Sequence, residues 1–310
     1  MRVFRDLNNL PAFRNSVITI GTFDGVHRGH QKIIERIKEL AREVDGESII
    51  ITFHPHPRLV INPGDKTLRL LNTIDEKIEL IEKCGIDNLV IVPFSRDFSE
   101  QSAESYINNF LVKSFKPQCI VIGYDHRFGK NREGNFLLLE KMKPQLGYRL
   151  EEITKETLDD IAISSTKIRN SLAEGDIKLA NELLGHNYTL SGMVVRGLQN
   201  GRKLGYPTAN IQVDDEFKLI PRKGVYTVRA KVNDQWYGGM MSIGFNPTFD
   251  GKQQTIEVNI FDFDWDIYGS KITVEFIHYI RDEKKFDTLD DLIAAIKKDE
   301  VVSRELLLAT

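Results

Sequence analysis

Cysteines are few and long apolar runs are missing in this 310-residue sequence. The two cysteines, Cys84 and Cys119, lie in a helical pattern and at the start of an apolar run, which favours small buried core residues over a disulfide framework or a CxxC metal site. No apolar core of signal-peptide length occurs in the N-terminal segment MRVFRDLNNL, and no stretch reaches the roughly 18 apolar residues of a membrane helix. We therefore expect a cytoplasmic protein without a membrane partner.

An excess of charge of one sign is also missing, because 42 Lys and Arg residues stand against 45 Asp and Glu, for a formal net charge of −3. Nucleic-acid binding requires a broad basic surface, so no nucleic-acid partner is predicted. Small anionic ligands remain open because they need only local positive charge. The length exceeds what one core usually accommodates, which predicts two domains, whereas the oligomeric state stays uncertain.

The first half of the chain alternates short β-branched runs with helical patterns. The expected strands are Val17–Gly21, Ser48–Phe53, Asn88–Pro93 and Gln118–Tyr124. A helical spacing on one face joins Ile33, Ile34, Ile37, Leu40 and Ala41. Alternating β and α elements predict a parallel sheet with crossover helices, that is, an α/β Rossmann-like domain over residues 1–185.

The second half repeats strand-like segments that Gly, Asn and Asp turn signals separate. The expected strands are Leu190–Arg196, Val225–Val232, Trp236–Ile243, Thr255–Phe263 and Lys271–Ile280. A final helix has Leu289, Leu292, Ile293 and Ile296 on one face. This pattern predicts a small antiparallel β-barrel domain capped by a C-terminal helix over residues 186–310. A helical connector, Asp176–Leu184, would precede it and stop at Gly185.

The strongest local signal is the segment GTFDGVHRGH at residues 21–30, where the first strand ends and the first helix begins. Parallel sheets bind ligands at this position, and the unpaired N–H groups of a helix start favour phosphate. The glycines would let the backbone approach the ligand, while His27 and His30 would add donors aimed at the same phosphates. The structural alternative is a Gly-bearing turn with two solvated histidines.

Two further histidines, His54 and His56, follow the second expected strand in the segment FHPHP. Their period-two spacing would place them on one side of an extended segment. No carboxylate-rich or Cys-bearing motif accompanies them, which disfavours a tight zinc site, and the prolines favour a rigid loop over a ligand. Whether either histidine touches ATP stays open.

The segment at 21–30, together with ISSTKIR at 163–169, resembles the paired signatures of the HxGH nucleotidyltransferase superfamily. The resemblance implies that the first motif holds the nucleotide and that the second contacts its triphosphate. It assigns catalytic roles to His27, His30 and Arg169 and nucleotide contacts to Gly21, Thr22, Phe23, Asp24, Gly25, Ser165 and Thr166. Attack of a phosphate oxygen on the α-phosphorus of ATP builds negative charge, so hydrogen-bond donors suit the reaction. A phosphate nucleophile is already ionised and needs no dedicated base.

A third segment, GYDHRFGK at 123–130, resembles the flavin-side loop of bacterial FMN adenylyltransferase domains. Asp125 and Phe128 match that loop, and the resemblance implies that both contact the flavin. His126 stands where an aromatic residue is common, so its role stays open. The alternative is an ordinary strand-end loop.

The segments GLQNGRKLG at 197–205 and YPTAN at 206–210 resemble the riboflavin kinase domain. The resemblance implies that Gly201, Lys203 and Gly205 lie in a loop over the ATP phosphates. It further implies that Thr208 and Asn210 hold Mg²⁺, which prefers hard oxygen ligands. The match continues through residues 242–249, 257 and 276–286.

Glu257 is the predicted general base of this second domain, because the 5′-hydroxyl of riboflavin must lose a proton as it attacks the γ-phosphorus. In TIEVNI it alternates with Ile256 and Val258 and so points away from their face. A solvated surface Glu is the alternative. Arg281 is a weaker candidate for the flavin side or for a mobile cover over it, and its alternative is a surface ion pair.

Taken together, the motifs resemble the prokaryotic bifunctional riboflavin kinase/FMN adenylyltransferase family over most of residues 15–286. The resemblance implies synthesis of FMN and then FAD from riboflavin, with ATP as co-substrate and Mg²⁺ as cofactor. Two other functions stay open: a single-activity adenylyltransferase whose barrel only binds flavin, and a flavin sensor without turnover.

Overall fold

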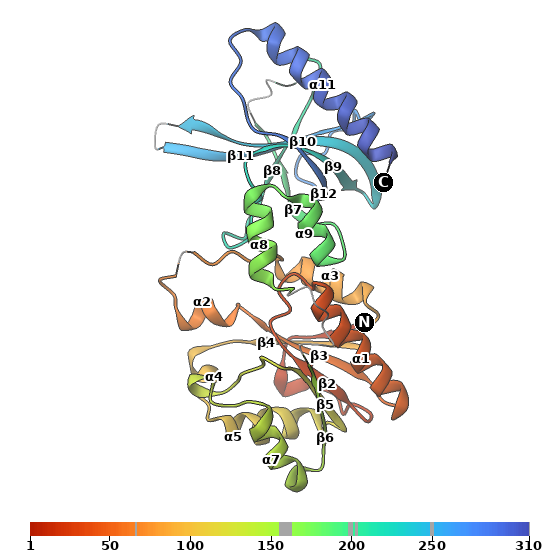
Figure 1. The fold of residues 1–310 in the computed structure, drawn as a ribbon, viewed down its shortest axis with the longest axis vertical. Coiled ribbons are helices and arrows are strands. Elements are labelled where there is room, and N and C mark those ends of the chain that lie inside the picture. Colours follow the sequence, from red (N-terminus) through yellow and green to blue (C-terminus); the bar gives the residue numbers. More distant parts are fainter. Residues whose placement is uncertain (66, 155–162, 198–200, 202–203, 249–250, 310) are drawn as a thin grey trace. The chain divides into compact units, whose positions relative to one another are not determined.

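The chain folds into two compact units in a computed structural model that describes every residue except 66, 155–162, 198–200, 202–203, 249–250 and 310 (Figure 1). Side chains within 246–253 are also outside the described part. Unit 1 comprises Met1–Leu68 and Ile74–Ser164, and unit 2 comprises Arg69–Thr73 and Ser165–Thr310. None of the helices in the described ranges has the length and apolar character needed to span a membrane.

Unit 1 is built on a parallel sheet with the strand order β1-β4-β3-β2-β5-β6. Its strands are β1 (Arg2–Phe4), β2 (Val17–Ile20), β3 (Ser48–His54), β4 (Asn88–Pro93), β5 (Cys119–Gly123) and β6 (Arg149–Ile153). The chain builds outward from β2 in one direction through β3 and β4, and later in the other through β5 and β6. The loop after β2 therefore lies at the topological switch point, where open parallel sheets bind ligands.

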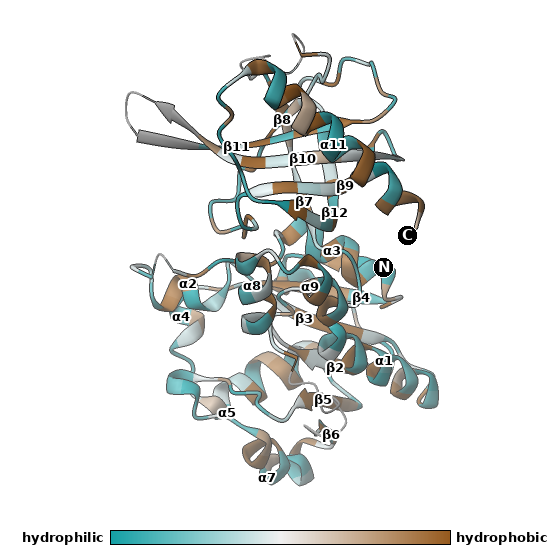
Figure 2. Ribbon diagram, turned by 45° about the horizontal axis from the view of Figure 1, so that its top comes forward, coloured by the Kyte–Doolittle hydropathy of each residue, from teal (hydrophilic) through white to brown (hydrophobic). Residues whose placement is uncertain are grey.

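Helices cover both faces of this sheet because alternate strand residues point to opposite sides. Ile18 and Ile20 of β2 join one hydrophobic core, whereas Val17 joins the other. Helices α1 (Arg28–Glu43) and α3 (Ile74–Lys83) pack on the second core, and η2 (Tyr106–Val112) and α7 (Phe136–Leu146) on the first. Figure 2 shows the matching pattern, with hydrophobic residues concentrated in the strands and both kinds of residue along α1.

Short helical segments fill the connections of unit 1. They are η1 (Leu7–Asn9), α2 (Pro57–Ile61), α4 (Arg96–Ser99), α5 (Ala103–Ser105), α6 (Lys113–Phe115) and η3 (Lys130–Arg132). The segment α5-η2-α6 is continuous, with the wider π-helical turn in its middle.

Unit 2 contains a closed barrel with the strand order β10-β11-β8-β7-β12-β9, in which neighbouring strands are antiparallel. Its strands are β7 (Thr189–Val195), β8 (Ala209–Gln212), β9 (Gly224–Val232), β10 (Gln235–Thr248), β11 (Gly251–Ile260) and β12 (Lys271–Arg281). Helices α8 (Ser165–Glu174) and α9 (Ile177–Leu184) precede the barrel, and α11 (Leu289–Leu308) ends it. Thr288 caps α11, because its hydroxyl accepts a hydrogen bond from the Asp291 N–H at 3.2 Å.

A short piece of the N-terminal half also belongs to unit 2. Leu70 forms a parallel bridge with Lys218, and its N–H and C=O bond to Phe217 and Leu219 at 2.7 and 2.8 Å. The Lys218 ammonium group is buried and donates to the Leu71 and Thr189 carbonyls at 2.8 and 2.6 Å. These contacts explain why residues 69–73 group with the barrel.

The predicted fold class is confirmed, and the differences are local. Strand β8 was not expected because it begins inside the YPTAN motif, and the short edge strands β1 and β6 lack a long β-branched run. The connector forms as α9, capped by Asp176 and ending at Gly185. The compact units divide between Ser164 and Ser165, so α8 and α9 lie in unit 2, while the functional boundary at residue 185 stays a prediction.

Candidate active sites

The GTFDGVHRGH segment forms the loop after β2 and the first turn of α1, as the sequence predicts. The loop turns sharply because Phe23, Gly25 and Val26 adopt the left-handed region, at φ values of 47°, 91° and 42°. Only Gly25 does so without a side-chain cost. The loop delivers the chain to the N-terminus of α1, a 16-residue helix, where unpaired N–H groups and the helix dipole favour an anion.

His27 and His30 lie together at this helix start. Their rings stack with centroids 3.7 Å apart, and His27 Nδ1 caps α1 by accepting a weak hydrogen bond from the His30 N–H at 3.4 Å. This bond assigns the proton of a neutral His27 ring to Nε2, so Nε2 is the donor nitrogen of the ring. Among the described residues, His30 Nδ1 is buried without a hydrogen-bond partner. Burial, followed by the charges of His27 and Lys77, lowers the pKa of His30 well below its usual value.

A lysine that the sequence reasoning missed lies against the same loop. Lys77 of α3 is buried, and its ammonium group donates to the Thr22 carbonyl at 2.7 Å. The hydroxyl of Thr52 donates to that carbonyl as well, at 3.2 Å. A detectable signal existed, because Lys77 falls on the apolar helix face that also contains Ile74 and Ile81.

The 123–130 segment follows β5, so it begins at the same edge of the sheet as the histidine loop. Asp125 is exposed there, whereas Phe128 is buried, with its ring stacked on Tyr106 at 5.0 Å between centroids. Burial lowers the pKa of His126 to about 4, although Asp125 opposes this shift. His54 is the last residue of β3 at this edge, and His56 caps α2 two residues later. Flavin contacts of Asp125 and Phe128 stay predictions.

The second nucleotidyltransferase motif leads into α8. Ser165 and Thr166 begin this helix, and the Arg169 Nε donates to the Arg69 carbonyl at 2.5 Å. These residues belong to unit 2, whereas the histidine loop belongs to unit 1. The predicted contact of the second motif with the triphosphate therefore stays an expectation from the family resemblance.

In the barrel, the predicted base and the predicted metal ligands do come together. Asn210 of β8 lies directly opposite Glu257 of β11 in the antiparallel register, and Thr208 precedes β8. The Thr208 hydroxyl donates to the Glu257 carboxylate at 2.9 Å. Asn259, which the sequence reasoning missed, donates to the Pro207 carbonyl at 2.7 Å and fixes the same segment. Its signal was the polar alternation of Glu257 and Asn259 along one face of β11.

The glycine-containing loop before YPTAN passes close to these ligands. A side chain at Gly197 would lie 2.3 Å from the Asn210 amide, so the absence of one makes room for Asn210. The Gly201 carbonyl accepts hydrogen bonds from the N–H groups of Leu204 and Tyr206 at 3.0 and 2.9 Å. Lys203 lies outside the described residues, as do residues 198–200 and Phe249 and the side chains of Asn246, Pro247 and Thr248.

A cavity of about 450 Å³ lies beside Thr208. One wall is the Pro207–Ala209 segment, another is formed by Val258 and Ile260 of β11, and the third is the turn at 263–268. This turn contributes Trp265, which is 60% exposed, and Tyr268, over which the Arg196 guanidinium lies at 5.5 Å. Apart from Thr208, Asp264 and Asp266 the cavity walls are apolar or aromatic, and such a cavity suits a nucleoside attached to phosphates.

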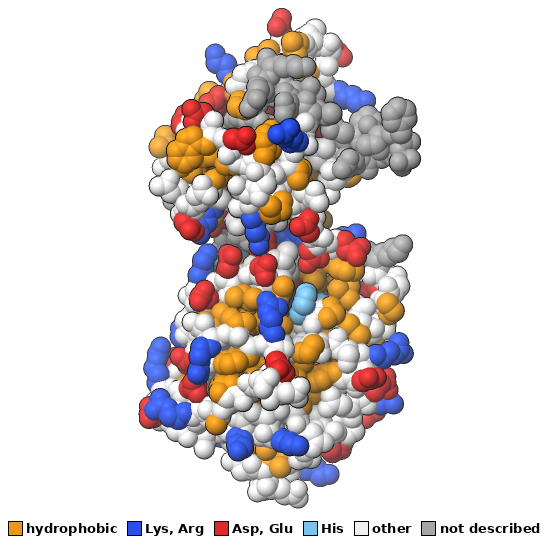
Figure 3. Space-filling model, turned by 180° about the vertical axis from the view of Figure 1, so that it is seen from behind, with side chains coloured by type: hydrophobic (Ala, Val, Ile, Leu, Met, Phe, Trp, Pro, Cys, Tyr) orange, Lys and Arg blue, Asp and Glu red, His pale blue; other side chains and the backbone are white. Residues whose placement is uncertain are grey.

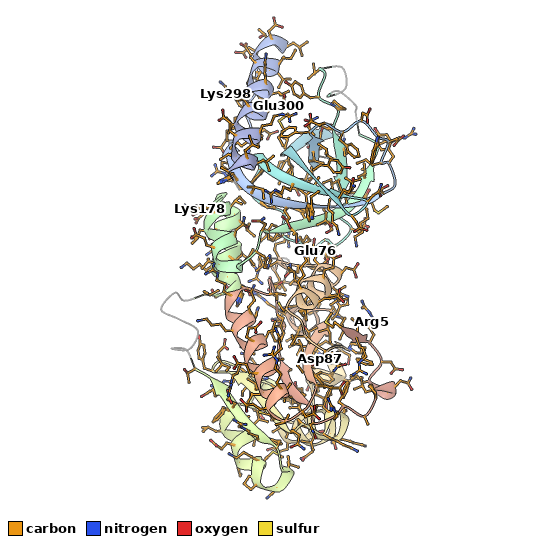
Figure 4. All side chains as sticks on the ribbon, turned by 90° about the vertical axis from the view of Figure 1, so that its right-hand side faces the viewer. Arg5, Glu76, Asp87, Lys178, Lys298 and Glu300 are labelled. Atoms are coloured by element: carbon orange, nitrogen blue, oxygen red, sulfur yellow. The ribbon has the colours of Figure 1, made fainter. Side chains whose placement is uncertain are left out.

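Arg281 forms an ion pair, which is the structural alternative that the sequence left open. Its guanidinium binds Asp299 of α11 through Nε and Nη2 at 3.0 and 2.7 Å, and the Asp299 side chain is buried. Contact of Arg281 with flavin stays a prediction. The same helix carries Glu300 (Figure 4), whose carboxylate binds Arg304 at 2.9 Å. The pKa of Tyr206 is raised by burial and by the Glu300 carboxylate, which accepts a hydrogen bond from the Tyr206 hydroxyl.

Two family models match the chain, and they divide it as its two folds do. The model described as FAD synthetase matches residues 10–167, and the one described as riboflavin kinase matches residues 184–307.

Curated relatives match nearly the whole chain. The bifunctional riboflavin kinase/FMN adenylyltransferase of Listeria monocytogenes is 38% identical over 94% of this chain and 92% of its own length. The protein of the same name from Escherichia coli K12 is 36% identical over 98% and 97%. A solved structure from Streptococcus pneumoniae, titled a macrolide-efflux protein, is 33% identical, covers 97% of this chain and 98% of its own, and has a TM-score of 0.86.

Proposed function

The chain belongs to the family of bifunctional riboflavin kinase/FMN adenylyltransferases, and we propose that its two reactions take place at two separate sites. The protein phosphorylates riboflavin to FMN and adenylylates FMN to FAD, with ATP as the second substrate of both steps. We assign the kinase step to the Thr208–Glu257 cluster and the adenylylation step to the His27–His30 loop. The observation that carries the assignment is the Thr208–Glu257 hydrogen bond, which joins a predicted metal ligand to the predicted base.

At the kinase site the nucleophile is a neutral hydroxyl. Glu257 accepts the proton that the 5′-hydroxyl of riboflavin loses as its oxygen attacks the γ-phosphorus of ATP, and ADP leaves. The Thr208 hydroxyl donates to Glu257 and thereby holds the carboxylate in one orientation. The adenosine of ATP occupies the cavity beside Thr208, with its base against the 263–268 turn.

The oxygen atoms at this site fit Mg²⁺. The Thr208 hydroxyl and the Asn210 side-chain carbonyl are hard oxygen ligands that would hold the ion together with the phosphates of ATP. Because Gly197 has no side chain, the Asn210 amide can pack closely against the backbone of residue 197. When bound, Mg²⁺ neutralises the negative charge that develops on the transferred phosphoryl group.

At the adenylylation site the nucleophile is the FMN phosphate, which is ionised before it reacts. Its oxygen attacks the α-phosphorus of ATP, and pyrophosphate leaves. The Nε2–H of His27, a ring N–H of His30 and the N–H groups of the α1 start donate to the phosphates and stabilise the developing charge. The pKa of His30 is lowered, so His30 acts as a neutral donor at neutral pH. From the family resemblance, Ser165, Thr166 and Arg169 add contacts to the triphosphate, and Asp125 and Phe128 to the flavin.

Both steps consume ATP, and we place the protein in the cytoplasm, where ATP is supplied. The chemistry requires no nucleic acid and no membrane. On the face drawn in Figure 3, acidic and basic side chains are interspersed, which suits small-molecule substrates that enter local sites.

Product analysis of the purified protein by HPLC tests this function. With riboflavin, ATP and Mg²⁺ we expect FMN and FAD, and with FMN and ATP we expect FAD alone. FAD from FMN without any FMN from riboflavin would reduce the barrel to a flavin-binding module, and no product at all would point to a sensor.

A further inference from the structure

Lys77 is a buried cation on α3, a helix of unit 1 whose residues Leu80 and Ile81 belong to a hydrophobic core. It follows Glu76, which is also buried and is labelled in Figure 4. Burial lowers the pKa of Lys77, whereas the charge of Asp24 raises it. Burying an ammonium group costs free energy, so an apolar residue at this helix position would stabilise the fold more easily. The cost points to a task for the charge.

Within the described part of the chain, the polar and charge interactions of Lys77 lie at the nucleotide loop. Its Nζ donates to the Thr22 carbonyl at 2.7 Å, and its charge acts on Asp24 and on His30. The Thr22 peptide immediately precedes Phe23, where the backbone enters the left-handed region at φ 47°. A residue other than glycine adopts this conformation only when the surrounding structure holds it.

Two donors hold the carbonyl before this turn. Lys77 approaches from α3 and the Thr52 hydroxyl from β3, so the loop is fixed from two neighbouring elements. The orientation of the Thr22 peptide sets the path of residues 23–27 and therefore the position of His27 at the start of α1. A loop held in this way needs no rearrangement when the nucleotide binds.

We propose that Lys77 is a positioning residue for adenylyl transfer, which fixes the Thr22 carbonyl and thereby presents the Gly21–His30 loop to ATP. The inference rests on the proposed assignment of adenylylation to this loop. Lys77 acts through the loop and touches neither the flavin nor the reacting phosphorus.

The test uses the full chain, in which the kinase reaction serves as an internal control. Lys77→Met removes the charge at similar length. We expect the KM for ATP in the conversion of FMN to FAD to rise about tenfold, since a loop that must be ordered on binding weakens affinity, with a smaller fall in kcat. Kinase kinetics should stay unchanged. Lys77→Arg, which keeps a donor, should recover part of the loss, and Lys83→Met at the exposed end of the same helix should have no effect.

Thr52→Val removes the second donor without removing a charge, and it decides the question if Lys77→Met fails to fold. We expect a rise in the KM for ATP in the same direction but smaller, with the melting temperature nearly unchanged. Unchanged FAD kinetics in Thr52→Val together with unfolded Lys77→Met would overturn the proposal, as would a folded Lys77→Met with normal FAD formation. His27→Ala is the reference variant. Loss of FAD formation in His27→Ala but not in Lys77→Met rejects Lys77 alone, whereas normal FAD formation in both rejects the assigned site.

Discussion

In the proposed assignment, unit 1 and unit 2 bind the same co-substrate, ATP, with different side chains. Unit 1 offers ring and backbone N–H donors at the start of α1, and unit 2 offers a carboxylate with a hydroxyl and an amide beside it. The nucleophiles explain the difference. A phosphate brings its own negative charge and needs donors around the ATP phosphates, whereas a hydroxyl needs a proton acceptor. The protonation state of the nucleophile thus determines which residue types each fold must supply.

The largest expected effect is the loss of kinase turnover when the proposed base, Glu257, is replaced. Glu257→Gln keeps the shape of the side chain and removes the proton acceptor, so FMN formation should fall by about 10²-fold or more with flavin affinity largely retained. Flavin fluorescence measures affinity, and HPLC measures turnover. An active variant would show that Glu257 is an ordinary surface carboxylate.

Replacement of a histidine at the proposed adenylylation site of unit 1 should have a smaller effect on turnover. His27→Ala or His30→Ala removes one positioned donor, and FAD formation from FMN should fall at least about tenfold while riboflavin phosphorylation persists. HPLC with each substrate in turn measures both rates. If both variants make FAD at the normal rate, the histidine loop is not the adenylylation site.

Asn210→Ala tests the metal ligands of unit 2. Loss of one oxygen ligand should suppress FMN formation and raise the Mg²⁺ concentration that the kinase requires, whereas conversion of added FMN to FAD should continue. A Mg²⁺ titration of both activities gives the comparison. An unchanged requirement would withdraw Asn210 as a ligand.

The two units also differ in how well the sequence predicts them. In both units, β-branched runs and turn signals predict the main strands. In unit 2, the motifs also predict a common site for Thr208, Asn210 and Glu257, which lie together in the barrel. The contribution of residues 69–73 to unit 2 was not foreseen, because a bridge between Leu70 and Lys218 depends on pairing across a long sequence separation. Lys77 could be noticed as a lysine on the apolar face of α3, but its role could not be predicted, because its partner is a backbone carbonyl that no residue type reveals.

The smallest expected effect concerns contacts within unit 2, between the helices α8 and α9 and the barrel. Asn181 of α9 donates to the Phe276 carbonyl at 2.9 Å, and the Arg222 N–H donates to the Leu172 carbonyl of α8 at 3.0 Å. We expect a fragment of residues 186–310 to form FMN but never FAD, and a fragment of residues 165–310 to melt about 5 °C higher because it keeps these bonds. Thermal unfolding of both fragments provides the measurement. Equal melting temperatures would show that α8 and α9 add nothing to the barrel.

A complementation assay tests the two-site assignment most directly. Full-length Glu257→Gln and His30→Ala chains are supplied with riboflavin, ATP and Mg²⁺, first separately and then as an equal mixture, and FAD is measured by HPLC. Glu257→Gln alone should form little FMN and hence little FAD, and His30→Ala alone should accumulate FMN. The mixture should form FAD at a rate well above the sum of the two, because FMN released by one chain reaches the intact adenylylation site of the other. A mixture that forms no more FAD than this sum, although the His30→Ala chain releases FMN and the Glu257→Gln chain converts added FMN, would contradict two separate sites.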